Sequence, residues 1–240
     1  MIPHSVTRLH IDANCHISVG SIPEQVTDLK VYELESLNIC LLSYSPLAHG
    51  CLPSSLCSLT LRVPNCVEPI PPGALPPSLT YLDLVCRTKL LSLPRSLQTL
   101  ILTKYNHDLD DEHFLPQSLT RLSLDTLFKG NIPPSSRLPL LRRLDVPSWD
   151  GNCPTKGKRR TTKIQVDLPP KLTTLSIRGI PRGATNTIPY GVTTLTLNTV
   201  RGLLPDSLTR LSVHEPKLVD PGAMPPLLKT IKKASIDFIT

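Results

Sequence analysis

Apolar residues along the chain recur in a ten-residue pattern of the form apolar-Pro-x-x-apolar-Thr-x-apolar-x-apolar. Clear copies are LPPSLTYLDL from Leu75, LPQSLTRLSL from Leu115 and LPDSLTRLSV from Leu204. Eleven copies follow one another at a mean spacing of about 22 residues, inside the roughly 20–29 residues of leucine-rich repeats. The copies lie near residues 2–11, 22–31, 52–61, 75–84, 93–102, 115–124, 138–146, 168–177, 188–197, 204–213 and 224–233.

The last three positions of most copies alternate between apolar and polar, as in Leu82-Asp83-Leu84. Alternation with a period of two is typical of a β-strand that is buried on one face. The threonine just before this tail is β-branched and favours extended backbone. The proline near the start of each copy has no N–H group to donate, so we expect it ahead of the strand. Each copy therefore predicts one short strand.

A single copy cannot bury its apolar face alone, but a stack of copies builds a continuous core. The sequence predicts a mainly β fold, a leucine-rich-repeat-like solenoid of about 11 units with one parallel sheet, filling residues 1–240 as one repeat array. The segments between strands are too short for a regular helix in each unit, so we expect a mostly irregular convex side. The inward residues should form one buried ladder that includes Leu82, Leu84, Leu100, Leu102, Leu122, Leu124, Leu175 and Leu195.

The recurring LPxSLTxLxL resembles the FNIP repeat, a relative of the leucine-rich repeat found in amoebal and giant-virus proteins. The Phe-Asn element that names this family has an echo in FKGNIP, residues 128–133. Some FNIP proteins carry an F-box ahead of the array, which implies substrate recognition within a ubiquitin-ligase assembly; because the first copy starts at Ile2, we expect no F-box. The LPxxLxxLxV pattern is also similar to bacterial effector ubiquitin ligases, whose catalytic cysteine domain is not expected here.

Composition narrows the cellular setting. The chain has 26 basic and 19 acidic residues, a formal charge of +7, and no apolar run of the length that a membrane span needs. Its N-terminus lacks the basic and apolar regions of a secretory signal peptide. The seven cysteines include no CxxC pair, so we read them as reduced thiols. We expect a cytoplasmic protein, with the nucleus as the alternative compartment, that does not bind membranes.

No motif of an enzyme is present: the sequence has no GxGxxG, Walker loop, GxSxG or HExxH. The densest polar cluster, residues 107–113, carries carboxylates and two imidazoles, but it falls between two strands, where a solvated loop is expected. We therefore expect no catalytic residue, no metal site and no cofactor.

The longest departures from the repeat spacing include a basic insertion at residues 147–167. Between its two acidic residues the insertion carries five basic residues: Lys156, Lys158, Arg159, Arg160 and Lys163. Such a cluster is either a solvated loop or a site that contacts phosphates or serves as a nuclear-localisation signal. Nucleic-acid binding through this insertion is one alternative function.

The polar positions of each strand should face away from the core on the concave side, which solenoids use as a binding surface. Because Arg and Tyr dominate protein-binding hot spots, we expect a protein partner of unknown identity on this face. The candidate partner-binding residues are Tyr81, Asp83, Arg121, Ser123, Arg143, Arg178 and Arg210. The leading hypothesis is a non-enzymatic interaction scaffold, with the nucleic-acid and ubiquitin-ligase roles as alternatives.

The last copy is degenerate, and apolar residues after Pro225-Pro226 recur at spacings of three and four. We expect residues 224–240 to form an atypical C-terminal cap, with a short helix that begins at these prolines.

Overall fold

The structure is a computed structural model, and it describes residues 2–12, 19–32, 50–62, 69–109, 114–147, 168–179, 188–199, 204–214 and 225–233. The basic insertion lies outside these ranges from residue 148 onward, and so do all five of its nominated basic residues. In this part of the chain each of the eleven sequence copies supplies one strand. The strands are β1 (Arg8–Asp12), β2 (Asp28–Tyr32), β3 (Ser58–Arg62), β4 (Tyr81–Val85), β5 (Thr99–Thr103), β6 (Arg121–Leu124), β7 (Arg143–Val146), β8 (Thr174–Gly179), β9 (Thr194–Thr199), β10 (Arg210–Val213) and β11 (Thr230–Lys233).

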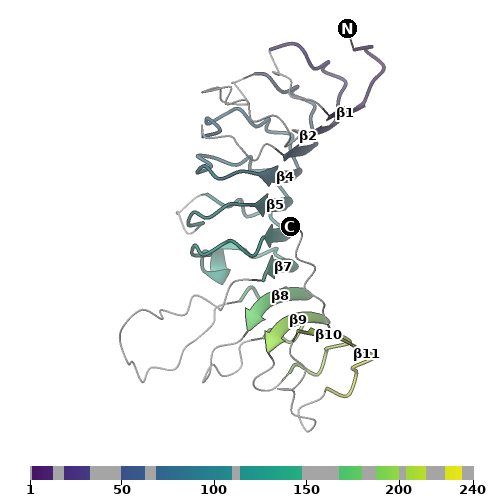
Figure 1. The fold of residues 1–240 in the computed structure, drawn as a ribbon, viewed down its shortest axis with the longest axis vertical. Helices are drawn as coiled ribbons and strands as arrows, with labels where there is room; N and C mark the ends of the chain where they lie inside the picture. The colour runs from purple at the N-terminus through teal and green to yellow at the C-terminus, as the bar shows by residue number, and fades with distance from the viewer. Residues whose placement is uncertain are drawn as a thin grey trace.

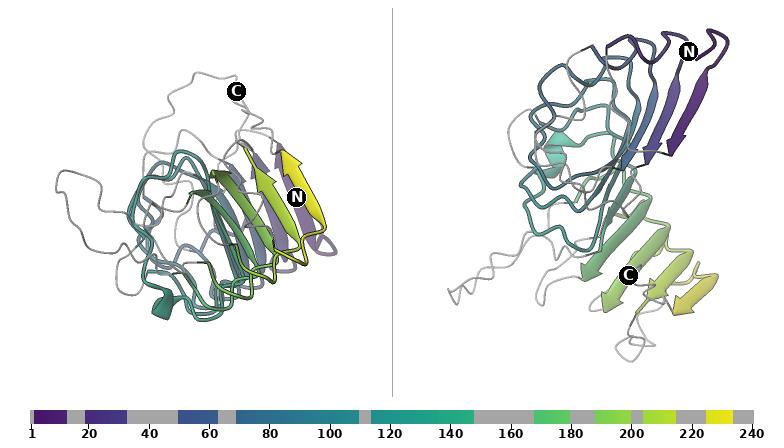
Figure 2. Two further views of the ribbon diagram at one scale, coloured as in Figure 1. Left: turned by 90° about the horizontal axis from the view of Figure 1, so that it is seen from below. Right: turned by 45° about the horizontal axis from the view of Figure 1, so that its top comes forward.

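All eleven strands belong to one parallel sheet in sequence order. Figure 1 shows them stacked along one side of the molecule, with the connecting segments on the opposite side and the line of strands bent, so that the sheet lines the concave side. The view along the stack in Figure 2 separates the same two sides. The predicted mainly β, leucine-rich-repeat-like solenoid is confirmed.

The connecting side contains little regular structure. Among the described residues it holds one short 3₁₀ helix, η1 (Ser135–Arg137). No helix in the described part of the chain is long and apolar enough to cross a membrane.

The inward residues form one ladder. In register, Leu82 of β4 pairs with Leu100 of β5, which pairs with Leu122 of β6. All eight leucines predicted for the core are buried, none with more than 3% of its surface exposed. A second buried column runs on the convex side, where Tyr105 and Phe128 are each 1% exposed. The sequence analysis noted the Phe128 segment only for its resemblance to the FNIP element and did not predict that it is buried.

Two rows of hydroxyl groups join successive units. The hydroxyl of Thr120 donates to the carbonyl oxygen of Gln98 at 3.1 Å, and equivalent bonds are made by Thr27, Thr80, Thr173, Thr193 and Thr209. The hydroxyl of Ser118 lies 2.7 Å from the carbonyl oxygens of both Arg95 and Leu97, and Ser55, Ser78, Ser96 and Ser207 make equivalent contacts. The repeat serine and threonine therefore satisfy backbone acceptors of the preceding unit.

The short helix predicted to begin at Pro225-Pro226 is wrong over residues 225–233. Thr230–Lys233 is a strand that pairs in parallel with β10, Ile231 opposite Leu211. The exposed edge of β10 supplies a template of backbone donors and acceptors, and this outweighs the apolar spacing of three and four. Residues 234–240 lie outside the described ranges, so the cap itself stays a prediction.

Candidate functional site

The candidate site is the outward face of the sheet on the concave side. Alternation along each strand turns the residues between the core leucines to this face. On β4 these are Tyr81, Asp83 and Val85, and on β6 they are Arg121 and Ser123. The face is therefore a grid of fixed side chains on regular backbone.

Five of these residues gather over β2, β3, β4 and β6, and we call them the Tyr81 cluster: Tyr32, Arg62, Tyr81, Asp83 and Arg121. The guanidinium carbon of Arg62 lies 5.5 Å from the centre of the Tyr32 ring, close enough for a cation–π contact. An Nη atom of Arg62 lies 3.3 Å from Oδ2 of Asp83 in an ion pair. Arg62 therefore links the tyrosine of β2 to the carboxylate of β4.

Asp83 is the buried member of the cluster, with only 7% of its surface exposed. Its second carboxylate oxygen, Oδ1, is buried without a hydrogen-bond partner in the described part of the chain. The Nε atom of Arg121 is likewise buried without a hydrogen-bond partner in the described part of the chain. Buried polar atoms are nearly always paired in folded proteins. The cluster therefore holds an unused acceptor and an unused donor.

The electrostatics of Tyr81 reflect this setting. Burial raises the pKa of the Tyr81 phenol above its ordinary value of 10.0, and the Asp83 carboxylate raises it further. The positive charges of Arg121 and Arg62 act in the opposite direction and leave a net increase. Tyr81 is therefore a neutral phenol at physiological pH.

This shift predicts a pH dependence of stability. Because the pKa of Tyr81 is raised in the folded state, its contribution is fully present below pH 10.0 and is lost as the pH rises through the higher folded-state value. We expect the free energy of unfolding to fall more between about pH 9 and about pH 11 in the wild type than in the Tyr81→Phe variant. Urea unfolding of both proteins at the two pH values measures this. Equal losses would contradict the assignment.

The cluster continues toward β1. The imidazole of His10 lies 3.1 Å from the carboxylate of Asp12, and its ring centre is 5.0 Å from that of Tyr32. His10 and Asp12 are both more than half exposed, so their contact contributes little stability. These two residues extend the polar and aromatic surface to the first strand.

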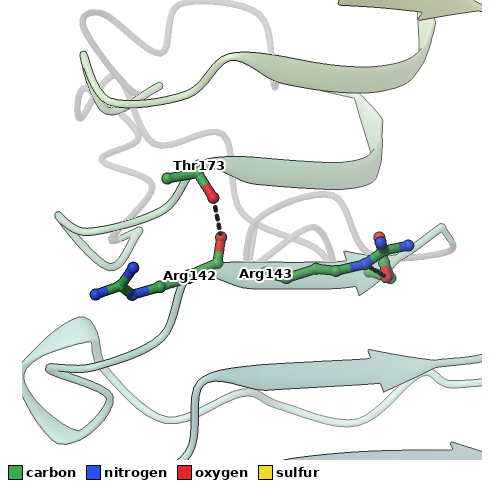
Figure 3. A network of polar contacts seen from close by, with 4 residues as sticks. Arg142, Arg143 and Thr173 are labelled. Carbon is green, nitrogen blue, oxygen red and sulfur yellow. Dashed lines mark hydrogen bonds and ion pairs between the residues drawn. The ribbon is translucent and has the colours of Figure 1, made fainter.

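Arg143 of β7 is adjacent to Arg121 in the sheet register, but it has a different partner. Its Nε atom donates to a carboxylate oxygen of Asp145 at 2.6 Å. Figure 3 shows the side chains of Arg142 and Arg143 leaving the strand in opposite directions, while the Arg142 carbonyl accepts the Thr173 hydroxyl at 3.2 Å. Ser123, half-buried, lies between Ile101 and Asp145 in register. Arg143 and Ser123 thus border the Tyr81 cluster.

The remaining nominated residues lie farther along the sheet. Arg210 is exposed on β10. Arg178 is on β8, but its side chain is outside the described part of the structure, as are Lys156, Lys158, Arg159, Arg160 and Lys163. The structure brings together Tyr81, Asp83 and Arg121 and adds Tyr32 and Arg62, which the sequence had not nominated. Their sequence signal was that each stands at the last outward position of its strand.

In the polar segment at residues 107–113, the described polar side chains make hydrogen bonds to the backbone of neighbouring segments. An imidazole nitrogen of His107 lies 2.8 Å from the Arg87 carbonyl oxygen, and a carboxylate oxygen of Asp108 accepts the Asn131 N–H at 2.7 Å. Residues 110–113 lie outside the described ranges. Within the described ranges no three His, Cys, Asp or Glu side chains converge as a metal site would require.

Comparison with known proteins supports the repeat assignment. The family model described as FNIP Repeat matches residues 45–86, which confirms the FNIP resemblance in the segment that carries β3 and β4. No curated protein sequence matches the chain significantly.

Two solved structures are similar to this chain. One is CroV588, a circular LRR protein, with 18% identity and a TM-score of 0.42 over 96% of this chain and 43% of that one. The other is YopM from Yersinia enterocolitica WA-314, with 21% identity and a TM-score of 0.43 over 95% of this chain and 55% of that one. The chain therefore spans about half the length of these proteins.

Proposed function

We propose that this protein is a non-enzymatic scaffold that binds a protein partner on the concave face of its repeat array, with the Tyr81 cluster as the anchor. The observation that carries the proposal is that Oδ1 of Asp83 and Nε of Arg121 are buried without a hydrogen-bond partner in the described part of the chain, on the sheet face that also carries Tyr81. Both atoms are enclosed in the free protein, so a partner that supplies a donor and an acceptor would satisfy them when docking shifts the surrounding side chains.

The composition of the cluster supports a protein partner. Tyr and Arg are enriched among the residues that dominate protein-binding energy, and they act best where neighbours exclude water. The side chains are also held in place before binding, because Arg62 is fixed by Tyr32 and by Asp83. Pre-organised side chains lose less entropy when a partner docks.

The free cysteines support a reducing compartment such as the cytoplasm for this scaffold. Cys51, Cys57 and Cys86 are free thiols among the described residues, and Cys51 and Cys86 are buried in the apolar core. Buried thiols of this kind behave as small apolar side chains.

Alanine substitutions in the cluster test the proposal. Once a partner is purified from the native cell, Tyr81→Ala and Arg121→Ala should each weaken its binding by about 1–2 kcal/mol, because each removes a large side chain of the anchor while the Arg62–Asp83 ion pair stays in place. Isothermal titration calorimetry measures the affinity, and thermal melts confirm that the variants fold.

Matched controls come from the same chain. Tyr190→Ala changes a tyrosine that is 83% exposed in the turn before β9, and Arg142→Ala changes an arginine that points away from Arg143. Both controls should bind normally. Normal binding by the Tyr81 and Arg121 variants, with loss of binding when residues 147–167 are removed, would move the site to the basic insertion.

A further inference from the structure

The concave face changes character between β7 and β8. On β1 to β7 several cations are matched by carboxylates, as in the Arg62–Asp83 and Arg143–Asp145 pairs. On β8 to β11 the outward positions include no acidic residue; they are Thr174, Ser176, Arg178, Thr194, Thr196, Asn198, Arg210, Ser212, His214, Thr230 and Lys232. This second half of the face therefore combines cations with hydroxyl groups.

Two of its cations are exposed and close together. Arg210 and Lys232 make no ion pair among the described residues. In register, Arg210 lies opposite Thr230, and Lys232 is two residues farther along the same neighbouring strand. Neighbouring strands are about 4.8 Å apart, and residues two positions apart on one strand are separated by about 6.6 Å. The two charges can therefore contact a single extended chain.

The hydroxyl groups around these cations are free to donate. Thr194 and Thr230 flank Arg210 on the adjacent strands, and Thr196 and Lys232 flank Ser212. Within the described part of the chain the hydroxyls of Thr194, Thr196 and Thr230 have no hydrogen-bond partner. Thr193 and Thr209, one residue before the strands, instead donate to backbone carbonyls. Free hydroxyls beside cations suit an anionic ligand.

The distribution of charge along the sequence also favours an anionic partner for this half of the face. Residues 1–146 contain 12 basic and 13 acidic residues, whereas residues 147–240 contain 14 basic and 6 acidic residues. Of these, residues 147–167 hold 5 basic and 2 acidic residues, and residues 168–240, which include β8 to β11, hold 9 basic and 4 acidic residues. The excess positive charge is therefore shared between the basic insertion and the part of the sequence that holds β8 to β11. Such an asymmetry raises the local concentration of anionic partners near one half of a surface.

We infer that β8 to β11 bind an acidic segment of the protein partner, an extended stretch rich in Asp and Glu whose carboxylates contact Arg210 and Lys232. This inference rests on the proposed concave-face function and adds the chemistry of the partner. An acidic peptide fits better than a nucleic acid because the outward positions of these strands carry no tyrosine, tryptophan or phenylalanine on which bases could stack.

A defined peptide tests the inference without knowledge of the native partner. The probe is a fluorescein-labelled peptide of about eight alternating Glu and Asp residues, which extends over about 27 Å, and its control is the matching Gln/Asn peptide. The wild-type protein should bind the acidic peptide, more weakly as salt is raised, and should not bind the neutral one. Fluorescence anisotropy gives the affinities.

The deciding variant is R210Q/K232Q, which should weaken binding of the acidic peptide by about tenfold. Its matched control is R8Q/K30Q at the opposite end of the sheet. There the two cations have the same diagonal placement, with Arg8 and Lys30 on adjacent strands, but Asp12 and Asp28 stand beside them on those strands. This control removes the same net charge and should bind the peptide as the wild type does.

Three results would overturn the inference. The first is wild-type affinity in R210Q/K232Q, and the second is an equal loss in R8Q/K30Q, which would indicate net charge alone. The third is tighter binding of an oligo-uridylate of similar length, which would assign the surface to nucleic acid. Because the peptide is a defined probe, its result is independent of the Tyr81 and Arg121 variants, so the two proposals can fail separately.

Discussion

Replacing Leu122 with alanine is expected to lower the free energy of unfolding by about 2–5 kcal/mol. Leu122 is fully buried on β6 between Leu100 of β5 and Leu144 of β7. The substitution removes apolar surface from the core and leaves a cavity that the neighbouring units, held by parallel backbone hydrogen bonds, close only in part. Urea unfolding followed by circular dichroism measures the loss.

The control for this substitution is Leu127→Ala, because Leu127 is 55% exposed just after the same strand. It should change stability by less than about 0.5 kcal/mol, as surface substitutions generally do. If Leu122→Ala also cost less than this, the stacked register of the leucine ladder would be contradicted. A loss of cooperativity would instead indicate that units on the two sides of β6 unfold separately.

The leucine ladder could be predicted from the sequence because it depends on two local rules. Alternation along a strand decides which residues face inward, and a repeat of similar length brings equivalent residues into register. Leu100 and Leu122 therefore became neighbours in the prediction and in the structure. Strand order and parallel direction followed from the same repeat, since each copy enters its strand at the same point.

The role of the hydroxyl residues was predicted only in part. The recurrent threonine was explained by its β-branched side chain, whereas the structure adds a hydrogen bond from its hydroxyl to the preceding unit, as in Thr120 and Gln98. The serine row was missed, although Ser55, Ser78, Ser96 and Ser118 occupy the same position of successive copies. The acceptors of these hydroxyls lie in another repeat, so the pattern within one copy does not reveal them.

In the candidate site, too, the sequence predicted which way the side chains face but not which of them touch. Alternation placed Tyr81, Asp83 and Arg121 on the outward face, but it did not indicate which residues touch. Arg62 reaches Asp83 diagonally on the adjacent strand, and this depends on side-chain conformation. Tyr32 belongs to the cluster through its cation–π contact with the same arginine.

A second stability prediction concerns Gly130, where the segment after β6 lies against the segment after β5. A Cβ atom added there would lie 2.7 Å from the carbonyl oxygen of His107 and 3.1 Å from Cα of Asp108. Both contacts are with backbone, which cannot rotate away. We expect Gly130→Ala to lower the free energy of unfolding by about 1–3 kcal/mol through this overlap.

The neighbouring residues explain why the overlap cannot be relieved cheaply. The Lys129 N–H donates to Oδ1 of Asn106 at 2.8 Å, and the Asn131 N–H donates to Oδ1 of Asp108 at 2.7 Å. Moving the Gly130 backbone outward would lengthen both bonds, which join the fifth and sixth units. Lys129→Ala keeps these bonds, because it changes only an exposed side chain, and should leave stability within about 0.5 kcal/mol. Thermal and urea unfolding of the two variants compare them directly, and equal stability would show that the two segments are not in contact.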